Sequence, residues 1–188
     1  MKTALLLIDI QNDYFENGAM ELHGSLDASE NARLLLETFR VYNFPVVHIQ
    51  HIAARPDATF FLPSTYGAEI HENVRPLADE KVVVKHYPNS FRETNLLQFL
   101  ADNEVRKLVI CGMMTHMCVD STVRAARDYG LEVVLVGDAC ATKDATLGDH
   151  LVCAHDVHVS FLAALNYFYA SVTSTQEFLF SFSSQNID

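Results

Sequence analysis

Short apolar runs recur along this 188-residue chain, and stretches with a helical spacing of apolar residues separate them. Runs this short suit buried strands rather than membrane spans or long helices. Strands that alternate with helices need crossover connections, and crossovers build a parallel sheet covered by helices on both faces. The pattern therefore predicts an α/β fold with strands at Thr3–Ile8, Pro45–Ile49, Lys81–Val84, Leu108–Cys111 and Val133–Val136, and a sixth at Ala170–Thr173.

The segments between these runs predict helices at 26–39 and 93–102, and a third from Thr115, as N-cap, to a closing Gly130. One or two further helices are expected within 145–169, and a last one at 176–182. We expect a single domain over residues 1–182, followed by a polar tail, 183–188, that frays. The long aromatic loop at 53–69 predicts a pocket wall or a subunit contact.

The charge balance limits the partners of this chain. There are 13 Lys and Arg residues against 24 Asp and Glu, which gives a net charge of −11. Because such a surface repels phosphate backbones and anionic lipid, we expect neither nucleic-acid nor membrane binding, and a small molecule suits the chain better. The N-terminal apolar run is too short to span a bilayer and lacks a signal-peptide cleavage site, so we expect a cytoplasmic protein with free thiols.

Three residues with reactive or ionisable side chains follow predicted strands, at the edge where parallel sheets bind ligands. Asp9 and Lys85 end two apolar runs, and Cys118 lies at the N-terminus of the third predicted helix, which would favour a thiolate. A thiol needs a base to become a nucleophile, and a carboxylate needs a cation to stay ionised in a dry cleft. If Lys85 lies two strands away from Asp9, its side chain would have to reach across about 10 Å. Taken singly, the three residues also suit a turn, a solvated strand end and core packing.

Three ordered motifs resemble those of the isochorismatase-like cysteine hydrolases, and the resemblance extends from Thr3 to about Leu179. They are Leu7-Ile8-Asp9-Ile10-Gln11-Asn12-Asp13-Tyr14, then Lys85 with Asn89-Ser90-Phe91 and Thr94, then the stretch from Gly112 through Cys118 to Ala126. The resemblance implies a three-layer α/β/α fold with a six-stranded parallel sheet of Rossmann-like topology. It also implies an oligomer, with a dimer or a larger homo-oligomer expected.

The activity that the resemblance implies is hydrolysis of a C–N bond through a thioester intermediate. Its catalytic triad would be Asp9, Lys85 and Cys118. A cis peptide bond between Met113 and Met114 would direct the backbone amides of Met114 and Cys118 toward the developing oxyanion. Six residues beside these positions are predicted to shape the substrate pocket: Tyr14, Phe15, Phe61, His86, Tyr87 and His116.

The chain departs from one branch of this family at the metal site. Nicotinamidases hold a metal with an Asp-x-His pair after the second strand and a later histidine, whereas this chain has His51 and Ala53 at the pair and only His71 in a matching place. We therefore predict no metal, with His51 and His71 as the weak candidates. No glycine-rich dinucleotide motif or P-loop is present, so we expect no organic cofactor.

Two alternatives stay open from the sequence. Isochorismatases cleave a vinyl ether without needing the cysteine, so Asp9 could act alone in that chemistry. The scaffold could also be non-catalytic, with Cys118 as a redox-sensitive thiol or a binding contact.

Overall fold

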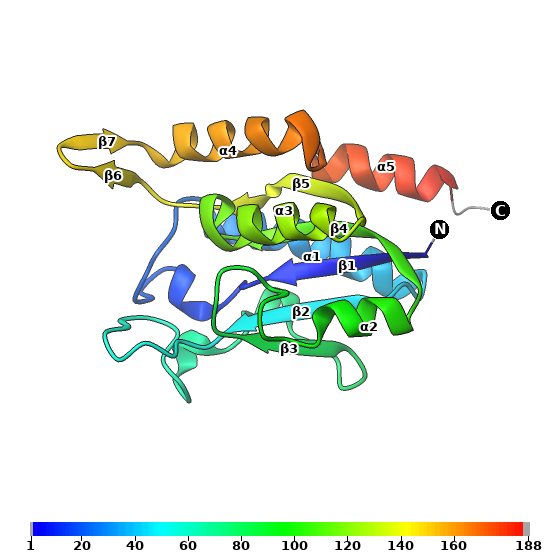
Figure 1. The fold of residues 1–188 in the computed structure, drawn as a ribbon, viewed down its shortest axis with the longest axis horizontal. Helices are drawn as coiled ribbons and strands as arrows, with labels where there is room; N and C mark the ends of the chain where they lie inside the picture. The colour runs from blue at the N-terminus through cyan, green and yellow to red at the C-terminus, as the bar shows by residue number, and fades with distance from the viewer. Residues whose placement is uncertain (1, 186–188) are drawn as a thin grey trace.

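The computed structural model describes residues 2–185 and contains a six-stranded parallel sheet between two layers of helices (Figure 1). The strand order is β3-β2-β1-β4-β5-β8. The strands are β1 (Lys2–Ile8), β2 (Val46–His51), β3 (Lys81–Lys85), β4 (Val105–Met113), β5 (Glu132–Ala141) and β8 (Ser171–Thr173). The predicted three-layer α/β/α architecture is confirmed, and each predicted strand is present.

Helices α1 (Ser25–Val41) and α5 (Thr175–Gln185) cover one face of the sheet. Helices α2 (Leu96–Asp102), α3 (Asp120–Asp128) and α4 (Ala154–Phe168) cover the other. Strand β1 is buried from Thr3 to Ile8 because helices cover it on both sides. Phe39 of α1 stacks on Phe182 of α5 at a ring separation of 5.2 Å, which joins the two helices of one layer. Among residues 2–185, no helix is long and apolar enough to cross a bilayer.

The segment expected to contain one or two helices, 145–169, contains helix α4, and it begins with a β-hairpin that was not predicted. Strands β6 (Ala145–Leu147) and β7 (His150–Val152) pair antiparallel across Gly148 and Asp149, and the hairpin projects from the body of the molecule (Figure 1). Gly148 has a φ of 59°, which a tight two-residue turn requires. The Gly-Asp pair between two short apolar stretches is a hairpin pattern, which our sequence analysis did not identify.

The third predicted helix begins differently from the prediction. Residues Thr115–Val119 form a π-helical turn, η4, and the regular helix α3 starts only at Asp120. The Thr115 hydroxyl does not cap the helix, because it donates to the Ala141 carbonyl at 3.2 Å and contacts His158 Nδ1 at 2.9 Å. Gly130, with a φ of 80°, does follow the last turn as predicted. The wider π turn therefore holds Cys118, which fits the frequent use of such turns at functional sites.

The predicted helix at 93–102 and the predicted tail also differ at their ends. Helix α2 starts at Leu96, since Glu93 has a φ of 56° and the Thr94 hydroxyl donates to the Ser90 carbonyl. Helix α5 continues to Gln185, so the first residues of the predicted fraying tail are helical. The remainder of that tail, 186–188, lies outside the described residues.

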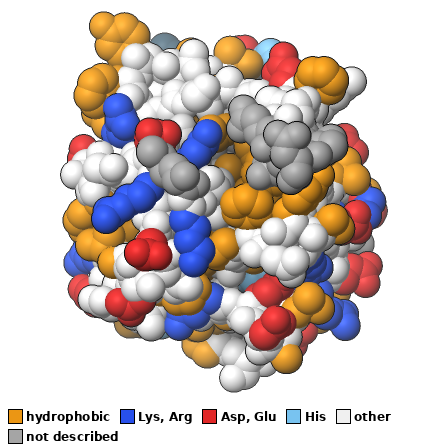
Figure 2. Space-filling model, turned by 90° about the vertical axis from the view of Figure 1, so that its right-hand side faces the viewer, with side chains coloured by type: hydrophobic (Ala, Val, Ile, Leu, Met, Phe, Trp, Pro, Cys, Tyr) orange, Lys and Arg blue, Asp and Glu red, His pale blue; other side chains and the backbone are white. Residues whose placement is uncertain are grey.

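The amino ends of the strands form the face seen in Figure 2, where basic and acidic side chains lie side by side. A shallow hollow at this end is lined by charged residues of both signs, which include Lys2, Arg40, Asp79, Glu80 and Lys81. The carboxyl ends of the strands lie at the opposite end of the molecule, where the predicted site residues are found.

Candidate active site

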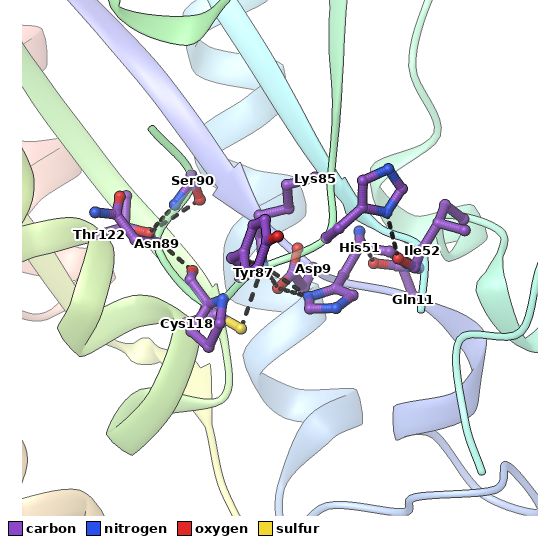
Figure 3. Close-up of polar contacts among 12 residues, drawn as sticks. Asp9, Gln11, His51, Ile52, Lys85, Tyr87, Asn89, Ser90, Cys118 and Thr122 are labelled. Atoms are coloured by element: carbon purple, nitrogen blue, oxygen red, sulfur yellow. Dashed lines mark hydrogen bonds and ion pairs between the residues drawn. The ribbon is translucent and has the colours of Figure 1, made fainter. Parts of the chain in front are cut away.

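The three predicted strand-end residues lie together at the carboxyl end of the sheet. Asp9 follows β1 with a φ of 50°, and its backbone N–H donates to the Ile49 carbonyl at 3.1 Å. The Lys85 Nζ lies 2.6 Å from Asp9 Oδ2 and 3.3 Å from Cys118 Sγ (Figure 3). Asp9, Lys85 and Cys118 are 0%, 1% and 5% exposed. A carboxylate, an ammonium and a thiol are thus enclosed within contact of one another.

Lys85 reaches Asp9 across the intervening strand β2, as the sheet order requires. The β2 residue in register with Lys85 is His51, whose Nδ1 lies 3.0 Å from Nζ. Nζ also donates to the Tyr87 carbonyl at 3.1 Å. These acceptors hold the lysine inward. From the sequence, we predicted a long reach for Lys85 but considered His51 only as a metal ligand. The position of His51 on the strand between β1 and β3 could have revealed its contact with Lys85.

The charges of this cluster are set by burial and by proximity. Burial lowers the pKa of Lys85, but the nearby Asp9 and Cys118 together raise it by more. The net shift is upward, and the side chain is an ammonium. Burial and the Asp9 carboxylate raise the pKa of Cys118, which outweighs the opposing effect of Lys85. These effects oppose the thiolate that we expected a helix N-terminus to favour. The cysteine lies in η4 ahead of α3, beside a carboxylate, and rests as a thiol.

Polar side chains that follow Asp9 form hydrogen bonds that hold the aromatic loop 53–69 over Asp9, Lys85 and Cys118. The Gln11 amide donates to the Ala68 carbonyl at 2.8 Å, and Asp13 Oδ2 accepts from the Phe61 backbone at 2.6 Å. A Cβ at Gly67 would lie only 2.0 Å from Asp13 Oδ1, so the carboxylate fits only against a glycine. The motif after β1 thus positions the loop that faces the thiol, a role that our sequence analysis did not assign.

A cavity of about 500 Å³ opens above Cys118 between this loop and the segment after β3. Its wall is mainly apolar and aromatic, with a few polar groups, a composition typical of sites for small molecules. Four of the predicted pocket residues line it: Tyr14, Phe61, His86 and Tyr87. Further lining residues that the sequence did not single out include His51, Arg55, Phe60, Met114 and Met117.

Two predicted pocket residues lie elsewhere. Phe15 is buried against His71, with ring centroids 3.7 Å apart, because the turn after Tyr14 carries it away from the cavity. His116 contacts the Thr142 hydroxyl at 2.5 Å and packs near Phe161. Residues two positions apart in a helical turn point to different sides, so His116 faces α4 while Cys118 faces the cavity.

The backbone ahead of Cys118 has the geometry that the resemblance implies. The Met113–Met114 peptide bond is cis. Gly112, with a φ of 130°, passes so close to β1 that a Cβ would lie 2.0 Å from the Ile8 carbonyl oxygen. The Ser90 backbone and hydroxyl contact Thr122 Oγ1 at 3.0 and 2.9 Å, which joins the segment after Lys85 to helix α3 (Figure 3). These contacts fix the thiol relative to the lysine.

The residues present do not fit a metal at this site. Within the described chain, the one group of three potential ligands that lie within 4.8 Å of one another is Asp9, His51 and Cys118. The Lys85 ammonium lies 2.6 to 3.3 Å from an atom of each, so a second cation there would be repelled. His71 lies apart from this group, stacked on Phe15, with its Nδ1 accepting from the Asn73 backbone.

Comparison with known proteins agrees with this fold. The isochorismatase domain model matches residues 3–177, and the chain belongs to this family of hydrolases. It is 52% identical to the isochorismatase family protein YddQ of Bacillus subtilis, over 95% of this chain and 99% of that protein. It is 38% identical to a streptothricin hydrolase of Streptomyces noursei, over 75% of this chain and 50% of that protein. The crystal structure of an isochorismatase hydrolase from Oleispira antarctica superposes with a TM-score of 0.90, at 46% identity, over 94% of this chain and 95% of that one.

Proposed function

We propose that this protein is a cysteine hydrolase that cleaves the C–N bond of a small amide or ureide through a thioester intermediate. One observation carries the proposal: the Lys85 ammonium bridges a buried carboxylate, Asp9, and a buried thiol, Cys118, beneath a cavity. A base and a nucleophile held together by a cation are the parts that acyl transfer requires.

In the first half of the reaction, Asp9 removes the proton of Cys118 as the sulfur attacks the substrate carbonyl carbon. The carbonyl oxygen gains negative charge, and the backbone N–H groups of Met114 and Cys118 are assigned to stabilise it. Asp9 then transfers its proton to the departing nitrogen as the C–N bond breaks. Ammonia or an amine leaves, and the acyl group remains on the sulfur.

In the second half, Asp9 accepts a proton from a water molecule that attacks the thioester carbon. The C–S bond breaks, the proton returns to the sulfur, and a carboxylic or carbamic acid leaves. Throughout, Lys85 keeps the carboxylate ionised and in place, since the ammonium favours the charged form of its neighbour. The resting thiol is compatible with this scheme because the proton moves to Asp9 only as the bond to carbon forms.

The cavity and the comparisons support a small substrate. A volume of about 500 Å³ is within the range of small-molecule sites. The streptothricin hydrolase among the relatives is named for a hydrolytic reaction. The presence of the thiol beside Asp9 favours acyl chemistry over vinyl-ether cleavage, which does not require it.

Ammonia release from a panel of primary amides and ureides tests the proposal. Wild-type protein is expected to release ammonia, Cys118→Ala is expected to release none, and Cys153→Ala, which alters an exposed thiol, is expected to match the wild type. Vinyl-ether turnover that survives Cys118→Ala would favour the isochorismatase reaction instead. Absence of both activities would favour the non-catalytic alternative.

We also propose that the chain forms a homo-oligomer through the β6–β7 hairpin and helix α4. A two-stranded hairpin is marginally stable by itself, yet Leu147 and Leu151 are 82% and 66% exposed on it, and Tyr167 of α4 is 91% exposed. Light scattering is expected to give a dimer or larger species that Leu147→Asp converts to a monomer, and a monomeric wild type would contradict the proposal. The cytoplasmic location stays a prediction.

A further inference from the structure

One polar residue of the site, His51, has no part in the mechanism above, although its position is closely controlled. The Gln11 side chain accepts from the His51 backbone N–H at 2.7 Å and donates to its carbonyl at 2.9 Å (Figure 3). The His51 ring lies beside the ion pair of Asp9 and Lys85, with Nδ1 3.9 Å from Asp9 Oδ2 and 3.0 Å from Lys85 Nζ. These contacts hold the imidazole beside the proposed base and its cation, a position from which it can act on both Lys85 and a bound substrate.

The contact with Lys85 fixes which ring nitrogen carries the proton. An ammonium has three donors and no acceptor, so the 3.0 Å contact is a hydrogen bond only if His51 Nδ1 accepts from Nζ and carries no hydrogen. A protonated ring would bring a second positive charge to within 3.0 Å of Lys85. Burial, and next the charge of Lys85, lower the pKa of His51 to about 4, in agreement with a neutral ring. The single ring proton therefore lies on Nε2.

The Nε2–H group faces the cavity. In the described part of the chain, residues 2–185, no protein group accepts a hydrogen bond from Nε2, and this atom is not among the buried polar atoms that lack a partner. The His51 side chain is 18% exposed and lines the cavity, whereas Asp9 and Lys85 are sealed beneath it. The outer edge of the ring thus offers a donor to whatever occupies the space above Cys118.

We propose that His51 bonds on two sides, holding Lys85 in place through Nδ1 and donating through Nε2 to a second acceptor atom of the substrate. The inference rests on the proposed function and narrows it. The substrate would carry, besides the scissile carbonyl, a further carbonyl oxygen or ring nitrogen, as a ureide or a diamide does. His51 is a positioning residue toward Lys85 and a binding residue toward the substrate.

Two substitutions separate these contacts. In His51→Asn the amide oxygen lies near the Nδ1 position, which keeps the acceptor for Lys85 and loses the outer donor. In His51→Gln the longer amide reaches the Nε2 position, which keeps a donor to the cavity and loses the inner acceptor. His23→Asn, whose side chain is 70% exposed, is the matched control.

Steady-state ammonia release is measured with malonamide and acetylurea, which carry a second carbonyl, and with butanamide, which does not. For the first two, we expect His51→Asn to raise KM at least about tenfold at nearly unchanged kcat, and His51→Gln to lower kcat about tenfold at nearly unchanged KM. Butanamide lacks the second acceptor, so its KM should rise less in His51→Asn than the KM values of malonamide and acetylurea. The proposal would be overturned if the two variants changed kcat and KM equally. It would also be overturned if both variants had the kcat and KM of the control, His23→Asn.

The tautomer is measured independently of activity. Long-range ¹⁵N–¹H correlation of the histidine rings at neutral pH, with His51→Asn to assign the signal, is expected to show His51 protonated on Nε2 alone. Protonation on Nδ1, or on both nitrogens, would overturn the contact with Lys85. If the wild type hydrolyses no amide, the proposed function and the substrate contact fail together, while the ring signals still decide the contact with Lys85.

Discussion

Two clusters that each combine a carboxylate, a cation and a histidine lie at opposite ends of the sheet. At the amino end, Glu80 accepts from Arg40 at 2.7 and 2.8 Å, from the Leu77 backbone at 2.8 Å and contacts His48 Nε2 at 2.9 Å. At the carboxyl end, Asp9 is completely buried and has the Lys85 ammonium at 2.6 Å. In the described residues, no hydrogen bond of regular geometry reaches either of its oxygens.

The difference separates a structural ion pair from a reactive one. Glu80 has its lone pairs occupied, so burial and bonding fix one protonation state and one geometry. Asp9 keeps capacity to accept a proton and lies close to the Cys118 thiol, beneath the cavity that Cys118 lines. A buried charge that lacks full hydrogen bonding costs stability, and such a cost is common where a group must change its proton during a reaction.

The largest contrast is expected from neutralising the two carboxylates. Asp9→Asn should lower kcat for amide hydrolysis at least about 10³-fold, a loss of about 4 kcal/mol in transition-state stabilisation, because no other group removes the Cys118 proton. Glu80→Gln should leave kcat nearly unchanged and lower the free energy of unfolding by about 1–3 kcal/mol. Ammonia assays and urea denaturation measure both. Similar activity losses in the two variants would remove the distinction between the clusters.

The two cations provide the next contrast. Lys85→Met should lower kcat by roughly 10²-fold, because Asp9 loses the charge that keeps it ionised and in place. Arg40→Met should leave kcat unchanged and cost a few kcal/mol of stability, roughly 2–4, since a nearly buried carboxylate loses its bidentate partner. Fluorescence-detected unfolding and initial rates distinguish them. An Arg40→Met protein of full stability would show that the amino-end cluster contributes little.

Acid should weaken the amino-end cluster in a defined pH window. Burial alone would raise the pKa of Glu80, but hydrogen bonds from Arg40, the Leu77 backbone and His48 lower it to about 2 from 4.5. The unfolded chain therefore takes up the proton first, and the contribution of Glu80, about 1–3 kcal/mol, is complete above pH 4.5 and disappears as the pH falls toward 2. Glu80→Gln should remove this part of the pH dependence of unfolding. An identical acid profile in the variant would contradict the assignment.

The smallest expected effect is spectroscopic. Because burial and Asp9 raise the pKa of Cys118, the free protein should show no thiolate absorbance at neutral pH that Cys118→Ala removes. Ultraviolet difference spectra between the two proteins measure this. A thiolate band lost in the variant would show that the cysteine is ionised before substrate binds.

The sequence predicted the sheet and the three strand-end residues because both depend on local patterns: apolar runs, and polar residues where they end. Contacts made across the sheet were harder to predict. His51 was known to follow the second strand, but only the strand order places it between Asp9 and Lys85. His116 and Cys118 face different sides of the turn Thr115–Val119, as residues two positions apart on a helix do, so helical spacing could already have excluded His116 from the pocket.

Intact-protein and peptide mass spectrometry after acid quenching during amide turnover tests the central claim most directly. We expect a fraction of the protein to carry the acyl group of the substrate on the peptide that contains Cys118, and none in Cys118→Ser or Asp9→Asn. Turnover that proceeds undiminished in Cys118→Ser, with no adduct on the wild-type cysteine, would contradict the account.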